Sequence, residues 1–159
     1  MRGHLKEKRL ILNRDYYDML SALCDAKAEF LVVGAFALAA HGYPRATGDI
    51  DIWIRRSDDN ASRVMAALKQ FHAPLLGLTK EDLQTSGVVF QIGVVPRRID
   101  ILTSISAVEF EDAWQGRKEV DIDGLRFFVI GRESLIRNKR ATGRPKDELD
   151  ARWLEVGDE

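Results

Sequence analysis

The sequence predicts an α/β or α+β fold, in which helices flank a mixed, twisted sheet and the chain ends in helices. Two observations support this prediction. Segments with strand-like and helix-like hydrophobic periodicity alternate along most of the chain, and the last part is helical. An Asp-Gly pair at positions 123 and 124 separates two short apolar runs. Such a pair is a strong signal for a β-hairpin, and therefore for antiparallel strands.

The length and composition indicate one domain of ordinary globular type. The chain has 159 residues, of which 45% are hydrophobic and 31% are charged, which is enough to bury a sizeable core. We expect a single domain over 1–159, with its core at about 29–130 and a C-terminal helical extension at about 131–157. The net charge of −1 argues against a globally basic nucleic-acid binder.

The cysteine count and the hydropathy pattern indicate a cytoplasmic protein. Cys24 is the only cysteine, so a disulfide framework is excluded and a reducing setting is expected. No stretch approaches the roughly 20 apolar residues of a membrane helix. The basic residues 1–9 are not followed by the apolar core of a signal peptide. We therefore expect no membrane association.

Capping residues and periodicity define the elements of the first half. Asn13 is a suitable N-cap for the first helix, and Gly42 is a suitable C-terminal cap for the second. Ser57 or Asp58 can cap the third helix. The expected elements are a helix at 14–27, a strand at 29–34, a short helix at 35–41, a strand at 49–54 and a helix at 58–71.

The second half begins with an ambiguous segment and ends in two helices. Pro74, Gly77 and Gly87 interrupt the region 73–87. Near the C-terminus, Gly143 ends one helix and Pro145 opens the next. The expected elements are strands at 88–93 and 97–102, a helix at 107–114, hairpin strands at 118–122 and 125–130, and helices at 134–142 and 146–156.

Two aspartates within an apolar strand form the most informative motif. Aspartate is depleted in strands, yet Asp49 and Asp51 alternate with Ile50 and Ile52. Residues i and i+2 of a strand share a face, so the two carboxylates point the same way. Like charges repel unless a positive group lies between them, and a divalent cation fits that description.

A third aspartate lies in a later apolar strand. Asp100 is flanked by Ile99 and Ile101. If this strand lies next to 49–54, three carboxylates converge at one end of the sheet. Such hard oxygen ligands favour magnesium or manganese over zinc. The alternative is that each acid caps a turn or pairs with an arginine, and Arg98 either binds phosphate or offsets the acids.

A glycine turn precedes the first two aspartates. Gly34 ends a strand and starts a helix, a geometry that offers backbone N–H groups to a phosphate. A dinucleotide-binding motif is excluded, because its second glycine would have to stand at Phe36. The chain contains no Walker A sequence either.

These motifs together resemble the signature of the polymerase-β-like nucleotidyltransferase superfamily. That signature is an apolar residue, Gly-Gly or Gly-Ser, a spacer, Asp-apolar-Asp and a later Asp. The matching residues are Val33-Gly34-Ala35, Asp49-Ile50-Asp51 and Asp100. The longer string from His41 to Asp49 and the C-terminal segment 138–150 resemble the small nucleotidyltransferases related to the AbiEii toxins and the minimal nucleotidyltransferases.

The resemblance implies a polymerase-β-like fold and a two-metal transfer of NMP from an NTP. It makes Asp49, Asp51 and Asp100 the catalytic and metal-binding residues, with Mg²⁺ or Mn²⁺ as the cofactor. The nucleotide-binding residues that it implies are Gly34, Ala35, Arg45, Thr47 and Lys139. Ala35 departs from the pattern, because the family has Gly or Ser there. Alanine still supplies an N–H, so we expect weaker or altered triphosphate binding.

The resemblance also implies a macromolecular acceptor, either a partner protein or the end of a tRNA. The setting would be a toxin–antitoxin or phage-defence system, in which a protein acceptor makes this chain the antitoxin and a tRNA acceptor makes it the toxin. One alternative is a small-molecule, antibiotic-type nucleotidyltransferase, against which the short segment after Ile130 argues. Another is a nucleotide-binding module that has lost turnover, to which only Ala35 points.

Several further residues have two interpretations. Lys139, Arg140, Arg144 and Lys146 form a basic stretch that either binds phosphates or pairs with the neighbouring acids. For Arg144 we favour a pair with an acid, and for Lys139 the two interpretations are balanced. The remaining alternatives are core packing or base stacking for Trp53, and a backbone contact or a catalytic role for His41.

Overall fold

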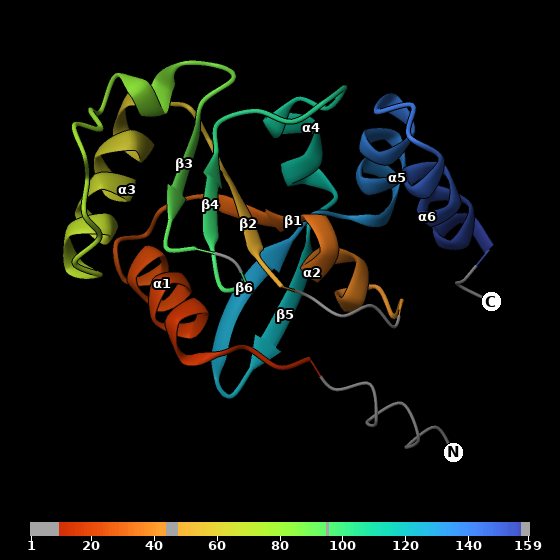
Figure 1. Ribbon diagram of the computed structural model, residues 1–159, viewed down its shortest axis with the longest axis horizontal. Coiled ribbons are helices and arrows are strands. Elements are labelled where there is room, and N and C mark those ends of the chain that lie inside the picture. The colour runs from red at the N-terminus through yellow and green to blue at the C-terminus, as the bar shows by residue number, and fades with distance from the viewer. Residues whose placement is uncertain (1–9, 44–47, 95, 157–159) are drawn as a thin grey trace.

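The computed structural model describes residues 10–43, 48–94 and 96–156. A six-stranded sheet with the strand order β3-β4-β2-β1-β6-β5 runs through its centre (Figure 1). The strands are β1 (Phe30–Val33), β2 (Ile50–Ile54), β3 (Val89–Ile92), β4 (Ile99–Leu102), β5 (Lys118–Ile122) and β6 (Leu125–Val129). The helices are α1 (Arg14–Asp25), α2 (Gly34–Ala40), α3 (Asp58–Gln70), the 3-10 turn η2 (Asp82–Gln84), α4 (Phe110–Gln115), α5 (Arg132–Ala141) and α6 (Pro145–Val156).

The sheet is mixed, which confirms the predicted fold class. β2 pairs with β4 in parallel and β1 pairs with β6 in parallel, whereas the other three pairings are antiparallel. The predicted hairpin is present as β5 and β6. Asp123 and Gly124 at its turn have φ values of 52° and 87°, as a tight two-residue hairpin turn requires.

Side chains from both faces of the sheet are buried. On one face Leu31 opposes Trp53 across β1 and β2, and α4 covers this face because Phe110 packs edge-on against Trp53 with ring centroids 5.0 Å apart. Trp53 therefore belongs to the core. The opposite face carries Ile52 and Val32, which are also fully buried. Within the described residues, no helix combines the length and apolar content that a membrane crossing would need.

The buried Asn60 of α3 connects that helix to β1 and β2. Its Oδ1 accepts a hydrogen bond from Glu29 N at 2.6 Å, and its Nδ2 donates to Glu29 O and Arg55 O, both at 2.9 Å. The helix begins as predicted, since Ser57 Oγ accepts from Asn60 N at 3.2 Å. In Figure 1, α1 and α3 lie together on the left of the sheet, and α5 and α6 lie together on the right.

Some predicted boundaries are wrong, and the backbone shows why. α4 begins at Phe110 rather than at 107, because Ala107 has a φ of 65° that no helix accommodates. α1 ends at Asp25 rather than at 27, and Lys27 also has a positive φ of 60°. α5 begins two residues earlier than predicted, at Arg132, and the ambiguous region 73–87 contains only η2.

We expect Asn60→Ala to lower the free energy of unfolding by about 2–3 kcal/mol, because Glu29 N and Arg55 O lose their hydrogen-bond partner at a partly buried site. Chemical denaturation followed by circular dichroism measures this change. Ser62→Ala, at an exposed position of the same helix, is the matched control and should change stability by less than about 0.5 kcal/mol. Equal effects of the two substitutions would contradict the bridging role of Asn60.

Candidate active site

Asp51 and Asp100 lie directly opposite each other on adjacent parallel strands. They are register partners of β2 and β4, which places their side chains on the same face of the sheet. Asp49 lies just before β2 begins. On its other side Asp51 pairs with Val33, the last residue of β1. The sequence-based expectation that the strand of Asp100 lies next to 49–54 is therefore correct.

The electrostatics of this pair are unfavourable for ionised carboxylates. Burial, together with the neighbouring Asp100 and Asp49, raises the pKa of Asp51 to about 6. Arg98 acts in the opposite direction but does not cancel the effect. The site therefore holds more negative charge than its own cationic residues offset.

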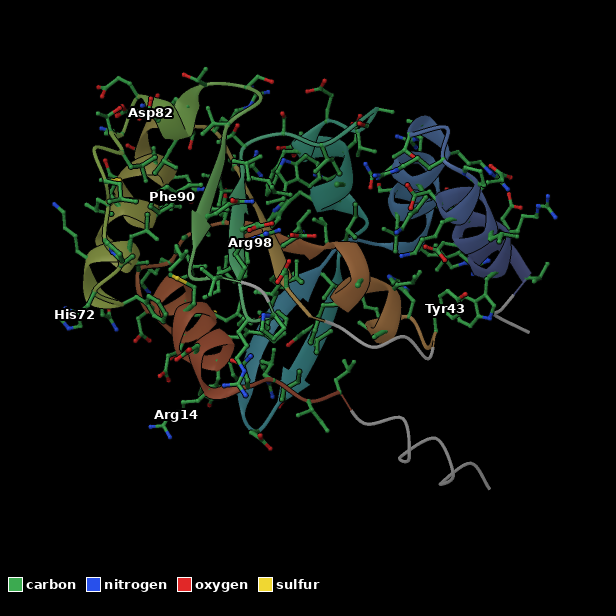
Figure 2. All side chains as sticks on the ribbon, viewed as in Figure 1. Arg14, Tyr43, His72, Asp82, Phe90 and Arg98 are labelled. Carbon is green, nitrogen blue, oxygen red and sulfur yellow. The ribbon has the colours of Figure 1, made fainter. Side chains whose placement is uncertain are left out.

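Arg98 lies against two of the three aspartates. Its Nε donates to Asp100 Oδ1 at 2.8 Å, and its Nη2 lies 3.1 Å from Asp100 Oδ2 and 3.0 Å from Asp49 Oδ2. Its backbone N donates to Asp49 Oδ1 at 3.1 Å. Figure 2 shows Arg98 near the middle of the molecule, beside β4. Of the two interpretations of Arg98, the structure places it on the acids.

The three aspartates suit a divalent cation in chemistry but are not arranged around one. Within the described residues, no three Asp, Glu, His or Cys side chains are close enough together to hold a metal ion as they stand. Carboxylate oxygens are nevertheless the donors that Mg²⁺ and Mn²⁺ prefer. Asp51 and Asp100 lie opposite each other, with Asp49 just before β2, and a positive charge among them would offset their mutual repulsion. The residues thus fit the cation, provided that Arg98 moves.

Gly34 is required by the position of Asp51. A Cβ at residue 34 would overlap Asp51 Oδ2 and would lie 3.2 Å from Asp51 Cγ. The φ of Gly34 is 71°, a backbone angle that residues other than glycine rarely adopt. The turn from β1 into α2 can therefore approach the aspartates closely only with glycine at this position. Helix α2 also starts at Gly34 itself, one residue earlier than predicted.

A pocket of about 370 Å³ joins this turn to the C-terminal helices. Gly34, Ala35 and Asp51 form one side of it. Leu102 and Ile105 come from β4 and the segment after it. The other side is formed by residues of α5, α6 and the loop between them, namely Asn138, Lys139, Thr142, Arg144, Lys146 and Asp147. The structure thus brings Gly34, Ala35 and Lys139 into one cavity with Asp51.

Lys139 is held by two buried acids at the base of this pocket. Its Nζ lies 3.4 Å from Asp147 Oδ1 and 3.2 Å from Asp150 Oδ2. The Lys139 side chain is only 12% exposed. The pKa of Asp147 is held below its usual value by hydrogen bonds from Thr142 and Arg144 and by the charge of Lys139, which together outweigh its burial. Lys139 therefore links α5 to α6.

The cations at the start of α6 are more accessible. Arg144 Nε donates to Asp147 Oδ2 at 2.9 Å, as the sequence led us to favour, but its side chain is 73% exposed. Lys146 is exposed and lines the pocket, and no carboxylate of the described residues pairs with it. Arg140 donates to the Glu155 carboxylate at 2.6 and 2.8 Å and does not line this pocket.

The other predicted residues have simple outcomes. Arg45 and Thr47 lie outside the described residues. His41 Nε2 lies 2.9 Å from Ile130 O, in agreement with the interpretation as a backbone contact. Tyr16 was not predicted as part of the site: its hydroxyl donates to Gly48 O and lies 3.3 Å from Arg98 O, and so joins the two segments that carry the aspartates. The helical pattern around Tyr16 gave no signal for this contact.

Comparisons with known proteins bear on the fold and the family. A crystal structure of a protein from Thermotoga maritima, described as a "putative nucleotidyltransferase", superposes with a TM-score of 0.59 and 17% sequence identity, covering 92% of this chain and 97% of that one. At this identity the likeness shows the fold alone. A search of curated proteins finds no match. The model of the family described as "nucleotidyltransferase of unknown function (DUF6036)" matches residues 12–158, and the chain therefore belongs to the DUF6036 family of nucleotidyltransferases.

Proposed function

We propose that this protein is a metal-dependent enzyme that transfers NMP from an NTP to a macromolecular acceptor. One observation carries the proposal. Asp51 and Asp100 oppose each other beside the Gly34 turn, and Asp51 lines a pocket whose far side carries Arg144 and Lys146. A carboxylate for a cation, Asp51, and cations for phosphates thus line one cavity, which is what nucleotidyl transfer needs.

The chain offers two groups of contacts for the triphosphate. The backbone N–H groups of Gly34 and Ala35 lie at the start of α2, where the positive end of the peptide dipoles faces the pocket. Across the pocket, Arg144 and Lys146 are placed to neutralise the phosphates. Lys139 pairs with Asp147 and Asp150 of α6 and so holds in place the loop and first turn that carry Arg144 and Lys146.

The reaction joins an acceptor hydroxyl oxygen to the α-phosphorus and breaks the bond from that phosphorus to the β-phosphate. Pyrophosphate is the leaving group, and the hydroxyl proton is transferred to Asp100 or to solvent. Divalent cations held by Asp49, Asp51 and Asp100 would lower the pKa of the hydroxyl and stabilise the charge that develops on the phosphates.

The macromolecular acceptor is proposed from the resemblance to the small nucleotidyltransferases related to AbiEii toxins. We propose a partner protein or a tRNA end as the acceptor, within a toxin–antitoxin or phage-defence system in the cytoplasm. Label found on a protein would support an antitoxin role, and label found on RNA would support a toxin role. A small-molecule acceptor is the remaining outcome of the same assay.

We expect Asp51→Asn to lower transfer by at least about 100-fold, more than the loss of a residue that merely supports a metal ligand. The assay incubates the purified chain with each α-labelled NTP, Mg²⁺ or Mn²⁺ and cell extract. Protein, RNA and small-molecule fractions are then examined for label. Asp112→Asn, which removes an exposed acid of α4, should leave transfer unchanged.

Two outcomes of this assay would contradict the proposal. Transfer by Asp51→Asn at the wild-type rate would remove Asp51 from the active site. If the wild type binds NTP but labels no fraction with either metal, the protein is a nucleotide-binding module rather than an enzyme.

Lys139 and Lys146 should differ in what their loss affects. We expect Lys139→Met to lower the free energy of unfolding by about 3 kcal/mol, because it removes the cation shared by two buried carboxylates. Lys146→Ala should leave stability unchanged and raise the KM for NTP about tenfold, the value of one contact with a charged group. Thermal unfolding and steady-state kinetics on both variants check this. A normal KM in Lys146→Ala would exclude the phosphate contact.

Ala35→Ser should tighten NTP binding by about 2- to 10-fold, because the added hydroxyl can donate one hydrogen bond to a phosphate. Equilibrium binding of a non-hydrolysable NTP analogue measures the change. Ala39→Ser, at a position of α2 that does not line the pocket, is the matched control. Identical affinities for Ala35→Ser and the wild type would show that the phosphates do not approach residue 35.

A further inference from the structure

One residue provides donors to every carboxylate oxygen of Asp49 and Asp100. The side chain of Arg98 contacts Asp100 Oδ1, Asp100 Oδ2 and Asp49 Oδ2, and its backbone N donates to Asp49 Oδ1. A cation needs lone pairs on these same oxygens. In this arrangement the Arg98 guanidinium competes with a metal for Asp49 Oδ2 and for both oxygens of Asp100.

We propose that Arg98 is a built-in competitor of the metal ion. Its guanidinium occupies Asp49 and Asp100 in the metal-free protein and is displaced when a divalent cation binds. The inference rests on the proposed function, since it concerns the same carboxylates. It assigns Arg98 a positioning role: the residue keeps the aspartates together in the absence of metal.

The surroundings of Arg98 allow this exchange. Its side chain is 28% exposed, so the guanidinium can leave toward solvent without opening the core. Its single positive charge contacts two aspartates, Asp49 and Asp100, and Asp51 lies opposite Asp100 on the neighbouring strand. A divalent cation supplies twice the charge at the same place. Exchange of the guanidinium for the metal is therefore electrostatically favourable.

The backbone donor distinguishes the two oxygens of Asp49. When the Arg98 side chain leaves, Asp49 Oδ1 keeps its bond to Arg98 N, because that group belongs to the backbone at the start of β4. Asp49 Oδ2 and both oxygens of Asp100 become free. Asp49 should therefore approach a cation through Oδ2, already oriented by the backbone.

Titration calorimetry with Mn²⁺ on the full chain tests the proposal. Arg98→Gln should bind Mn²⁺ at least about tenfold more tightly than the wild type, because hydrogen bonds to charged groups no longer compete with the metal. Arg97→Gln is the matched control, since it removes one positive charge from the neighbouring, exposed residue. It should change the affinity by less than about threefold, because charges that face solvent are screened.

A second measurement reports on the resting state. In a chelating buffer Arg98→Gln should unfold at a lower temperature than the wild type, because the aspartates have lost their partner. Added Mn²⁺ should raise its midpoint more than that of the wild type. Arg98→Lys, which offers a point charge in place of the planar donor set, should lie between the two in Mn²⁺ affinity.

The possible failures are distinguishable. If the wild type and Arg98→Gln bind Mn²⁺ equally, or if Arg97→Gln tightens binding as much as Arg98→Gln does, the competitor role is wrong while the metal site stands. If Arg98→Gln binds Mn²⁺ more weakly than the wild type, the competitor role is likewise wrong. If no variant binds Mn²⁺, the metal site of the proposed function is wrong, and the competitor role is wrong with it.

Discussion

The opposition of Asp51 and Asp100 on adjacent parallel strands is the constraint on which the rest of the structure depends. Two carboxylates that share one face of a sheet repel each other, and burial increases the penalty. The neighbouring backbone has to leave room for them, and only glycine at position 34 does so. A cation has to stand beside them, and in this structure that cation is Arg98. Each feature is explained by the charge that the strands bring together.

The C-terminal helices complete the site with a second set of charges. α5 and α6 bring buried acids and a lysine together at the base of the pocket, so that Lys139 serves as a link between helices. This link fixes the loop in front of it, and the exposed Arg144 and Lys146 follow in that loop and the first turn of α6. The same basic stretch therefore divides into a structural part, which is buried and paired, and a part that faces the cavity.

Much of this could be predicted, because acids inside apolar strands have few explanations. Asp100 was marked as a partner of Asp51 on the condition that their strands are neighbours, which the structure meets, and turn chemistry predicted the hairpin at Asp123-Gly124. The partner of Arg98 could not be predicted, since the choice between a phosphate and an acid depends on distances between strands. Lys139 was ambiguous for the same reason. The start of α4 was missed because alanine favours helices, whereas Ala107 adopts a positive φ in the fold.

Under the proposed function, the electrostatics of the site would also explain how the protein can remain folded without a bound metal. Three aspartates with no counter-charge would push apart the ends of β2 and β4, which are the strands that hold them in register. Arg98 prevents this with a side chain anchored two residues from Asp100 in the sequence, so the counter-charge is always present at the site. Under the proposed function, a metal cation would have to compete with it. Under the proposed function, a site built in this way would favour an ion that carries more charge than a guanidinium and binds oxygen strongly, over monovalent ions that offer neither advantage.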